Sequence, residues 1–307
     1  MIKIPPYLKA GDTIGITCPA GFMPLENINN CVETLHSWGY KTLVGKTVGV
    51  ESGNYFSATD NERLLELQEM LDNKNINAIL FGRGGYGMGR IIDEIDFSNF
   101  KANPKWLAGY SDITILHCHL NSNLKVASLH APMAAAFAEA GGKLYIRILK
   151  NVLEGSESIF ECPHHSFNNL GEASGRLIGG NLALLSHVIG TPSEYSTKNK
   201  LLFIEDVGEY IYNIDRMLYQ LKRSRKFKNI AGLIVGSFSN IKDTDRPFGK
   251  TIEEVIYSFT KNMDCPVCYN FPVGHTPKNV ALKVGGKYKL VVNKDKTNLI
   301  DLSPGLV

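Results

Sequence analysis

Short apolar runs alternate with longer amphipathic segments through the first half of the chain. Residues 78–81 and 106–108 are continuously apolar, which is typical of strands buried on both faces of a sheet. The segment 61–73 places leucine and methionine side chains at the three- to four-residue spacing of a helix. Further elements of these two kinds are expected at residues 12–17, 28–38 and 125–129. This alternation predicts an α/β fold in which a mainly parallel sheet has helices on both faces.

The second half of the chain has a different pattern. Residues 155–169 form a polar, irregular stretch, which we interpret as a linker. Beyond it, helices are expected at about 210–223 and 252–261, and the tail from residue 267 to 302 is rich in strand-forming residues. A length of 307 residues also favours about two domains. We therefore predict an N-terminal domain over residues 1–160 and a second α/β domain, with mixed or antiparallel strands, over 161–307.

Composition excludes several classes of function. The net charge of +3, with charges of both signs interspersed, is too small to indicate binding to nucleic acid or to a membrane surface. We expect no membrane span, since no window contains roughly 20 consecutive apolar residues, and residues 1–7 lack the apolar core of a signal peptide. The six scattered cysteines favour free thiols in a reducing compartment. These features predict a cytoplasmic protein.

Ser111 follows a predicted buried strand and precedes a predicted helix, in the segment Gly109-Tyr110-Ser111-Asp112. A serine at such a turn can expose its hydroxyl beside converging backbone N–H groups, as in a nucleophile elbow. The ordinary alternative is a serine that caps the helix, with Asp112 as a first-turn acid. The five-residue pattern G-x-S-x-G is also incomplete, because residue 113 is isoleucine. The local sequence leaves both interpretations open.

A glycine-rich segment, residues 82–89, directly follows the predicted strand 78–81. Gly82, Gly84 and Gly87 match the dinucleotide-binding pattern G-x-G-x-x-G. The acidic residue that should follow about 20 positions later is missing, and the segment does not follow the first strand. Its backbone N–H groups could instead bind an oxyanion or a carboxylate, or the segment could be only a tight turn.

Two further residues follow predicted strands. Glu205 comes after the apolar run 201–204, and carboxylates at such strand ends often face the ligand crevice of an α/β fold, although solvation in a loop is the simpler alternative. His275 lies between a glycine and a threonine after another strand, where a single histidine is often structural. Cys265 and Cys268 have redox spacing but lead into a strand, so we interpret them as structural. The histidines lack the spacing of a helical zinc site, and no metal is predicted.

Several of these segments, taken in order, resemble the LD-carboxypeptidase family of serine peptidases. The resemblance extends over nearly the whole chain, from LKAGDTIGITCPAG at residues 8–21 through RGGYG at 83–87 and GYSDIT at 109–114. It continues through GGNL at 179–182, FIEDVGE at 203–209 and FPVGH at 271–275. The family resemblance implies a flavodoxin- or amidotransferase-like N-terminal domain, a C-terminal swivelling β/β/α domain and a homodimer.

The resemblance also implies roles for individual residues. Ser111 would be the nucleophile, His275 the general base and Glu205 the carboxylate that orients the histidine. The backbone N–H groups of Gly85 and Asp112 would form the oxyanion hole, and the family's own pattern does not require a glycine at position 113. We further hypothesise that Arg83, or an exposed N–H group of the glycine-rich segment such as that of Gly84, binds the terminal carboxylate of a peptide substrate.

The implied activity is release of the terminal D-Ala from murein tetrapeptide during peptidoglycan recycling, without a cofactor. A family member of the microcin C immunity type, which would cleave aminoacyl- or peptidyl-nucleotides, is the main alternative. That activity needs an aromatic group for a nucleobase, and neither Trp38 nor Trp106 lies between residues 155 and 205, where we would expect it. A nucleotide-dependent oxidoreductase built on Gly82–Gly87 is an alternative of a different class.

Overall fold

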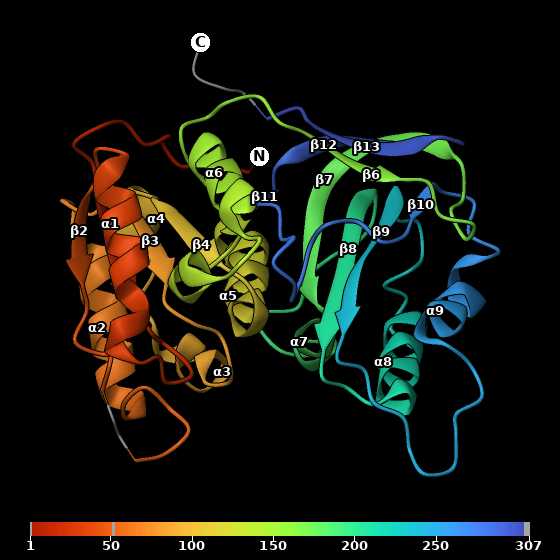
Figure 1. The fold of residues 1–307 in the computed structure, drawn as a ribbon, viewed down its shortest axis with the longest axis horizontal. Helices are drawn as coiled ribbons and strands as arrows, with labels where there is room; N and C mark the ends of the chain where they lie inside the picture. The colour runs from red at the N-terminus through yellow and green to blue at the C-terminus, as the bar shows by residue number, and fades with distance from the viewer. Residues whose placement is uncertain (1, 51–52, 304–307) are drawn as a thin grey trace.

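The computed structural model describes residues 2–50 and 53–303. It contains two sheets, one at the left and one at the right of Figure 1. Within the described residues, the first sheet has the strand order β11-β5-β4-β3-β1-β2. Its strands are β1 (Thr13–Thr17), β2 (Lys41–Val44), β3 (Ala78–Phe81), β4 (Trp106–Gly109), β5 (Ser128–His130) and β11 (Leu282–Val284). All neighbouring pairs are parallel except β5 and β11.

Helices cover both faces of this sheet, as the sequence predicts. Successive side chains of β3 point to opposite faces: Ala78 and Leu80 pack with α1 and α6, and Ile79 and Phe81 pack with α2, α3 and α5. A capping box between Thr59 and Glu62 begins α2. The helices are α1 (Asn29–Ser37), α2 (Asp60–Asp72), α3 (Met88–Ile91), α4 (Ser98–Ala102), α5 (Thr114–His119) and α6 (Lys143–Leu153).

The second sheet mixes parallel and antiparallel strands, also as predicted. Strands β7 to β10 are parallel, whereas β12, β13 and β6 continue the sheet in antiparallel fashion. Its strands are β6 (Ile159–Pro163), β7 (Gly171–Asn181), β8 (Lys200–Val207), β9 (Gly232–Ser239), β10 (Val267–Cys268), β12 (Lys287–Val292) and β13 (Lys296–Asp301). The apolar sides of α7 (Leu182–His187), α8 (Ile211–Arg223) and α9 (Ile252–Thr260) pack in the same core as Ile178, Leu202 and Leu233.

Two local predictions were wrong. The stretch interpreted as an irregular linker contains β6. This strand pairs with β13 at the edge of the second sheet, and its side chains alternate between exposed and buried. The strand expected at residues 125–129 begins three residues later, at Ser128, because Lys125 adopts a left-handed conformation (φ 56°) that ends the preceding helical turn. Both errors concern short elements whose tertiary partners the local sequence does not show.

The connection between β10 and β11 crosses from the second sheet to the first. It brings a short strand from the C-terminal part of the chain to the edge of the N-terminal sheet, beside β5 (Figure 1). The division at residues 160 and 161 therefore stays a prediction. The structure describes all six cysteines as free thiols. None of the helices within residues 2–50 and 53–303 is long and apolar enough to cross a membrane.

Candidate active site

Ser111 lies at a strained turn at the carboxyl end of β4. Its φ is +64°, a left-handed conformation that costs a side chain other than glycine roughly 1–2 kcal/mol. A short 3-10 turn, Ser111–Ile113, follows and leads into α5. The cap position of that turn is Tyr110, and no side chain caps it. The helix-cap interpretation of Ser111 is therefore wrong, and the strand, strained serine and helix have the geometry of a nucleophile elbow.

The glycine-rich segment after β3 packs directly against this turn. A Cβ added to Gly84 would lie 2.7 Å from Ser111 Cβ and 2.9 Å from its Oγ, so only glycine fits there. On the other side, the N–H of Gly21 donates to the Gly84 carbonyl at 2.9 Å. The space that a dinucleotide pyrophosphate would need beside Gly84 is thus filled by the serine and by a second loop.

Buried charged groups fix the glycine-rich segment in place. Asp112 Oδ2 accepts a hydrogen bond from the Met88 N–H at 2.7 Å, at the end of the segment, and burial raises the pKa of Asp112 to about 6. The guanidinium of Arg63, which is fully buried, donates to the carbonyls of Gly87 and Pro19 and pairs with Asp60. Arg63 could not be predicted from the sequence, because one basic residue in an amphipathic helix carries no local signal of burial.

The two N–H groups expected to form the oxyanion hole are not used elsewhere. Within the described residues, neither the Gly85 nor the Asp112 N–H donates to a backbone or side-chain acceptor. Gly85 has a φ of +105°, which only glycine adopts readily, and it packs on the Cα of Gly21. Arg83 is exposed beside these residues, and its Nη1 donates to the Phe22 carbonyl at 2.9 Å.

Glu205 and His275 form a hydrogen-bonded pair. Glu205 is fully buried near the end of β8, and its Oε2 accepts from His275 Nδ1 at 2.7 Å. Gly274 makes this approach possible, because a Cβ there would lie 2.8 Å from Glu205 Oε2. Burial by itself would lower the pKa of His275, but the negative charge and hydrogen bond of Glu205, with the charge of Asp206, raise it above the ordinary value. Glu205 is therefore not a solvated loop acid, and the role of His275 as a general base stays a prediction.

The pair lies against the serine turn. The His275 ring packs on the ring of Tyr110, the residue before Ser111, with centroids 4.7 Å apart. No hydrogen bond joins Ser111 Oγ to His275 within the described parts of the chain. Catalytic hydrogen bonds are often long in free enzymes and shorten only in the complex with substrate. The structure thus brings together three residues that are far apart in the sequence.

A hydrogen bond joins the second sheet to the helix that follows the serine turn. The Asn181 N–H, at the end of β7, donates to Thr114 Oγ1 in α5 at 3.1 Å, and a Cβ on Gly180 would collide with the same threonine. The Asn181 side chain donates in turn to Asp206 Oδ1 at 2.8 Å, beside Glu205. Burial, followed by the charge of Glu205, raises the pKa of Asp206 to about 7. In the sequence, only the family resemblance points to GGNL at residues 179–182.

Two buried histidines support the turn from behind. His117 donates from Nε2 to the Gly109 carbonyl at 2.9 Å and accepts at Nδ1 from Ser128 Oγ at 2.8 Å, and burial lowers its pKa to about 4. His130 lies between the rings of Tyr110 and Phe203. The histidines, cysteines and acids of the described residues form no cluster of three or more that could hold a metal ion.

Comparisons with known proteins identify the family. Residues 14–131 match the LD-carboxypeptidase N-terminal domain, and residues 174–290 match the LD-carboxypeptidase C-terminal domain. The probable murein peptide carboxypeptidase of Bacillus subtilis is 34% identical over 92% of this chain and 90% of its own length. The microcin C7 self-immunity protein MccF of Escherichia coli is 28% identical over 97% of this chain and 96% of its own.

Solved structures agree with the sequence comparison. The crystal structure of muramoyltetrapeptide carboxypeptidase from Oxalobacter formigenes superimposes with a TM-score of 0.84 and 28% identity, covering 95% of this chain and 99% of that one. The two-domain architecture predicted from the sequence is therefore confirmed, as is the expected hydrolase class. The chain belongs to the LD-carboxypeptidase family of serine carboxypeptidases.

Proposed function

We propose that this peptidase releases the terminal D-Ala from murein tetrapeptide by an acyl-enzyme mechanism. The observation that carries the proposal is the Glu205–His275 hydrogen bond, with the His275 ring packed against the turn of Ser111. A serine, a base and an orienting carboxylate are the groups that acyl transfer from a peptide requires. Two relatives have murein carboxypeptidase names, from Bacillus subtilis and Pseudomonas aeruginosa, which supports this substrate class.

In the proposed reaction, His275 removes the proton of Ser111 Oγ as that oxygen attacks the scissile carbonyl. Glu205 holds the Nδ1–H tautomer and stabilises the imidazolium. The N–H groups of Gly85 and Asp112 bind the oxyanion, and each such donor is worth about 3–4 kcal/mol in known enzymes. His275 then protonates the amine of D-Ala as it leaves, and water attacks the acyl-enzyme with His275 again as the base.

We assign Arg83 and the nearby N–H of Gly84 to the terminal carboxylate of the substrate. The guanidinium is exposed, and within the described residues it has no acidic partner that a substrate carboxylate would have to displace. A guanidinium suits a carboxylate because it donates two parallel hydrogen bonds. Arg83→Ala should therefore raise KM for the tetrapeptide much more than it lowers kcat. An unchanged KM would remove this assignment.

A substrate of the microcin type is the second candidate, because MccF is a relative over nearly the full chain. Neither tryptophan is placed to stack on the nucleobase of such a substrate, because Trp106 is fully buried in β4 and Trp38 packs on Tyr40 and Phe137. This favours the murein peptide. We further propose a cytoplasmic enzyme of peptidoglycan recycling that acts as a homodimer.

The test compares substrates under identical conditions. Purified murein tetrapeptide and an aminoacyl-sulfamoyl adenosine are supplied separately, and release of D-Ala or of the amino acid is measured by mass spectrometry. We expect the higher kcat/KM with the tetrapeptide. A murein pentapeptide, which ends in a D,D-bond, is the control and should release D-Ala far more slowly. A higher kcat/KM with the nucleotide would make the microcin-type substrate the favoured candidate. If the enzyme hydrolyses neither compound, both proposed substrates are rejected.

A further inference from the structure

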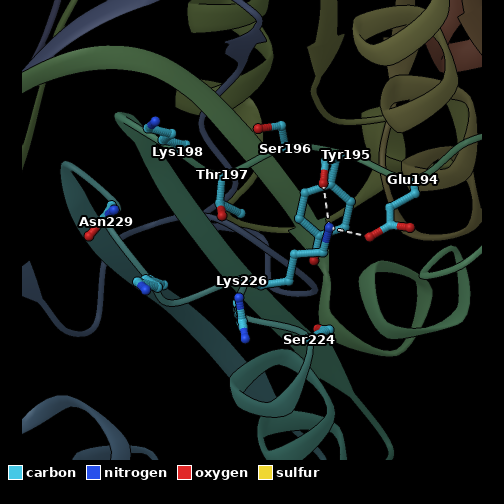
Figure 2. A pocket seen from close by; sticks show the side chains of 10 residues that line it. Glu194, Tyr195, Ser196, Thr197, Lys198, Ser224, Lys226 and Asn229 are labelled. Carbon is cyan, nitrogen blue, oxygen red and sulfur yellow. Dashed lines mark hydrogen bonds and ion pairs between the residues drawn. The ribbon is translucent and has the colours of Figure 1, made fainter.

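A basic hollow lies at the opposite end of β8 from the candidate active site. It has a volume of about 490 Å³ and is lined by residues of two segments, 194–198 and 224–229 (Figure 2). These segments flank the start of β8 at Lys200, whereas Glu205 lies five residues later in the strand. At about 3.3 Å per residue, the strand separates the two places by roughly 16 Å. The hollow is therefore a feature separate from the catalytic groups.

The hollow has an excess of positive charge. Lys198, Arg225, Lys226 and Lys228 line it, together with one acid, Glu194. That acid is already occupied, because its Oε1 accepts from Lys226 Nζ at 2.6 Å and its Oε2 from the Gly190 N–H at 2.9 Å. Within the described residues, the other three cations have no acidic partner within 4.0 Å. A multiply charged anion would relieve the repulsion between them.

The walls of the hollow are held in place by buried contacts. Lys226 is 6% exposed, donates to the Tyr195 carbonyl at 2.6 Å as well as to Glu194, and so ties one segment to the other (Figure 2). A second tie is the hydrogen bond from the Asn199 N–H to the Asn229 carbonyl at 2.8 Å. Arg225 has a φ of +62°, a conformation that a residue with a side chain adopts at a cost of roughly 1–2 kcal/mol. These contacts hold Lys226 and the backbone of the two segments in place, and the exposed side chains of Lys198, Arg225 and Lys228 extend from that backbone.

An uncharged donor in the hollow also lacks a partner. Thr197 is 4% exposed, and its hydroxyl makes no hydrogen bond within the described residues although it lines the hollow. The hydroxyl oxygen itself is not among the buried unpaired polar atoms, so it is open to solvent in the hollow and can donate to a ligand oxygen. Ser196 beside it is exposed and adds a second hydroxyl. Hydroxyl donors between cationic side chains form the usual environment of a tetrahedral oxyanion.

We propose that this hollow binds a small ligand that carries a diphosphate group. The volume exceeds the need of a single phosphate and lies within the range of small-molecule sites. Among the described residues that line the hollow, Tyr195 is the only aromatic one. It is 2% exposed, and Lys226 Nζ lies 4.7 Å from the centre of its ring. No aromatic face is left there to stack on a nucleobase, so recognition rests on the phosphate oxygens.

The test is calorimetric titration of the full chain with inorganic pyrophosphate at about 0.15 M ionic strength. We expect binding at a single site, and about 10-fold or greater weakening in Arg225→Gln and in Lys228→Gln, since a charged hydrogen bond is worth about 1.5–3 kcal/mol. Both side chains are exposed, so the variants should melt at the wild-type temperature. Ser111→Ala should bind pyrophosphate as the wild type does, because the site does not depend on catalysis.

Lys222→Gln is the matched control. It removes the same charge from the adjacent end of α8, but Lys222 Nζ lies over the Tyr219 ring at 5.8 Å and does not line the hollow. The affinity of this variant for pyrophosphate should differ from that of the wild type by less than about 2-fold, as expected for a screened surface charge. ADP, added in a parallel titration, separates two sources of the diphosphate: equal affinity indicates recognition of the phosphates alone, and tighter binding indicates added nucleoside contacts.

Three outcomes would overturn the proposal. They are no heat of binding with millimolar pyrophosphate, equal weakening in Lys222→Gln and Arg225→Gln, or binding of citrate as tight as that of pyrophosphate. The last result would mean that net charge alone attracts anions to this surface.

Discussion

The turn that carries Ser111 and the pair formed by Glu205 and His275 are held by different kinds of contact. The turn is local: β4 leads into a left-handed serine, and the neighbouring glycine-rich segment packs on it. The pair joins the end of β8 to a connection 70 residues later in the chain. It meets the turn through tertiary contacts, which are the packing of the His275 ring on Tyr110 and the hydrogen bond from Asn181 to Thr114. The proposed nucleophile is thus positioned locally, whereas its proposed base depends on the docking of distant segments.

Loss of the proposed nucleophile should have the largest effect. Ser111→Ala should lower kcat for D-Ala release by about 10⁴- to 10⁶-fold, because the acyl-enzyme cannot form. Steady-state kinetics on murein tetrapeptide measure this, with the melting temperature as a check on folding. Residual activity within about 10-fold of the wild type would mean that the local turn is not the source of the nucleophile.

Glu205→Gln tests the distant pair. It should lower kcat by about 10³- to 10⁴-fold, because the amide no longer fixes the tautomer of His275 or stabilises its imidazolium. A fall of less than about 10-fold would show that the buried carboxylate does not act through the histidine.

The pH profile gives a readout that a merely structural role of Glu205 would not change. His275 acts as a base only when neutral, and the charge of Glu205 raises its pKa above the ordinary value of 6.5. The acid limb of kcat/KM in the wild type should therefore lie above pH 6.5. In Glu205→Gln it should move to lower pH, since burial, which lowers the pKa, is no longer opposed by this charge. An acid limb that stays in place would contradict the proposed coupling.

The contact between the sheets should matter less. Thr114→Val keeps the shape of the side chain but leaves the Asn181 N–H buried without an acceptor, at a cost of about 1–3 kcal/mol in stability. Because this contact positions the acid–base pair, kcat should fall by about 10-fold with little change in KM. Thr114→Ser, which retains the hydroxyl, is the control and should restore most of the rate. If Val and Ser behave alike, the hydrogen bond does not link the two regions.

Relief of strain at the turn should be the smallest effect. Ser111→Gly removes the side chain from a left-handed position, so it should be more stable than Ser111→Ala by about 1 kcal/mol, although both are inactive. Denaturant unfolding of the two variants measures the difference. Equal stabilities would mean that the turn relaxes once the hydroxyl is gone, and the local contribution to the site would then be smaller than inferred.

Prediction from the sequence succeeded where the signal is periodic or local. The apolar face of residues 61–73 predicted α2 to within one residue at each end, and the run 78–81 predicted β3. It failed at β6 and at the start of β5, where short strands depend on pairing partners far along the chain. Arg63 was not predicted for a similar reason, because it is an ordinary helical residue until the tertiary structure buries it against Gly87. Thr114 was considered only as a capping residue, since its contact with Gly180 is also tertiary.

Local patterns of residues were enough to predict the α/β class, the glycine-rich segment after β3 and the serine turn after β4. These follow from hydrophobic period and turn chemistry, which act over a few residues. From the residues alone, Ser111 could equally have capped a helix, and only the family resemblance linked it to Glu205 and His275. The other features of the site arise from tertiary contacts. It set the left-handed φ of Ser111, excluded any side chain from Gly84, and paired a buried carboxylate with a histidine against Tyr110. Such contacts form only when two sheets pack together, and packing between distant segments leaves no periodic trace in a single sequence.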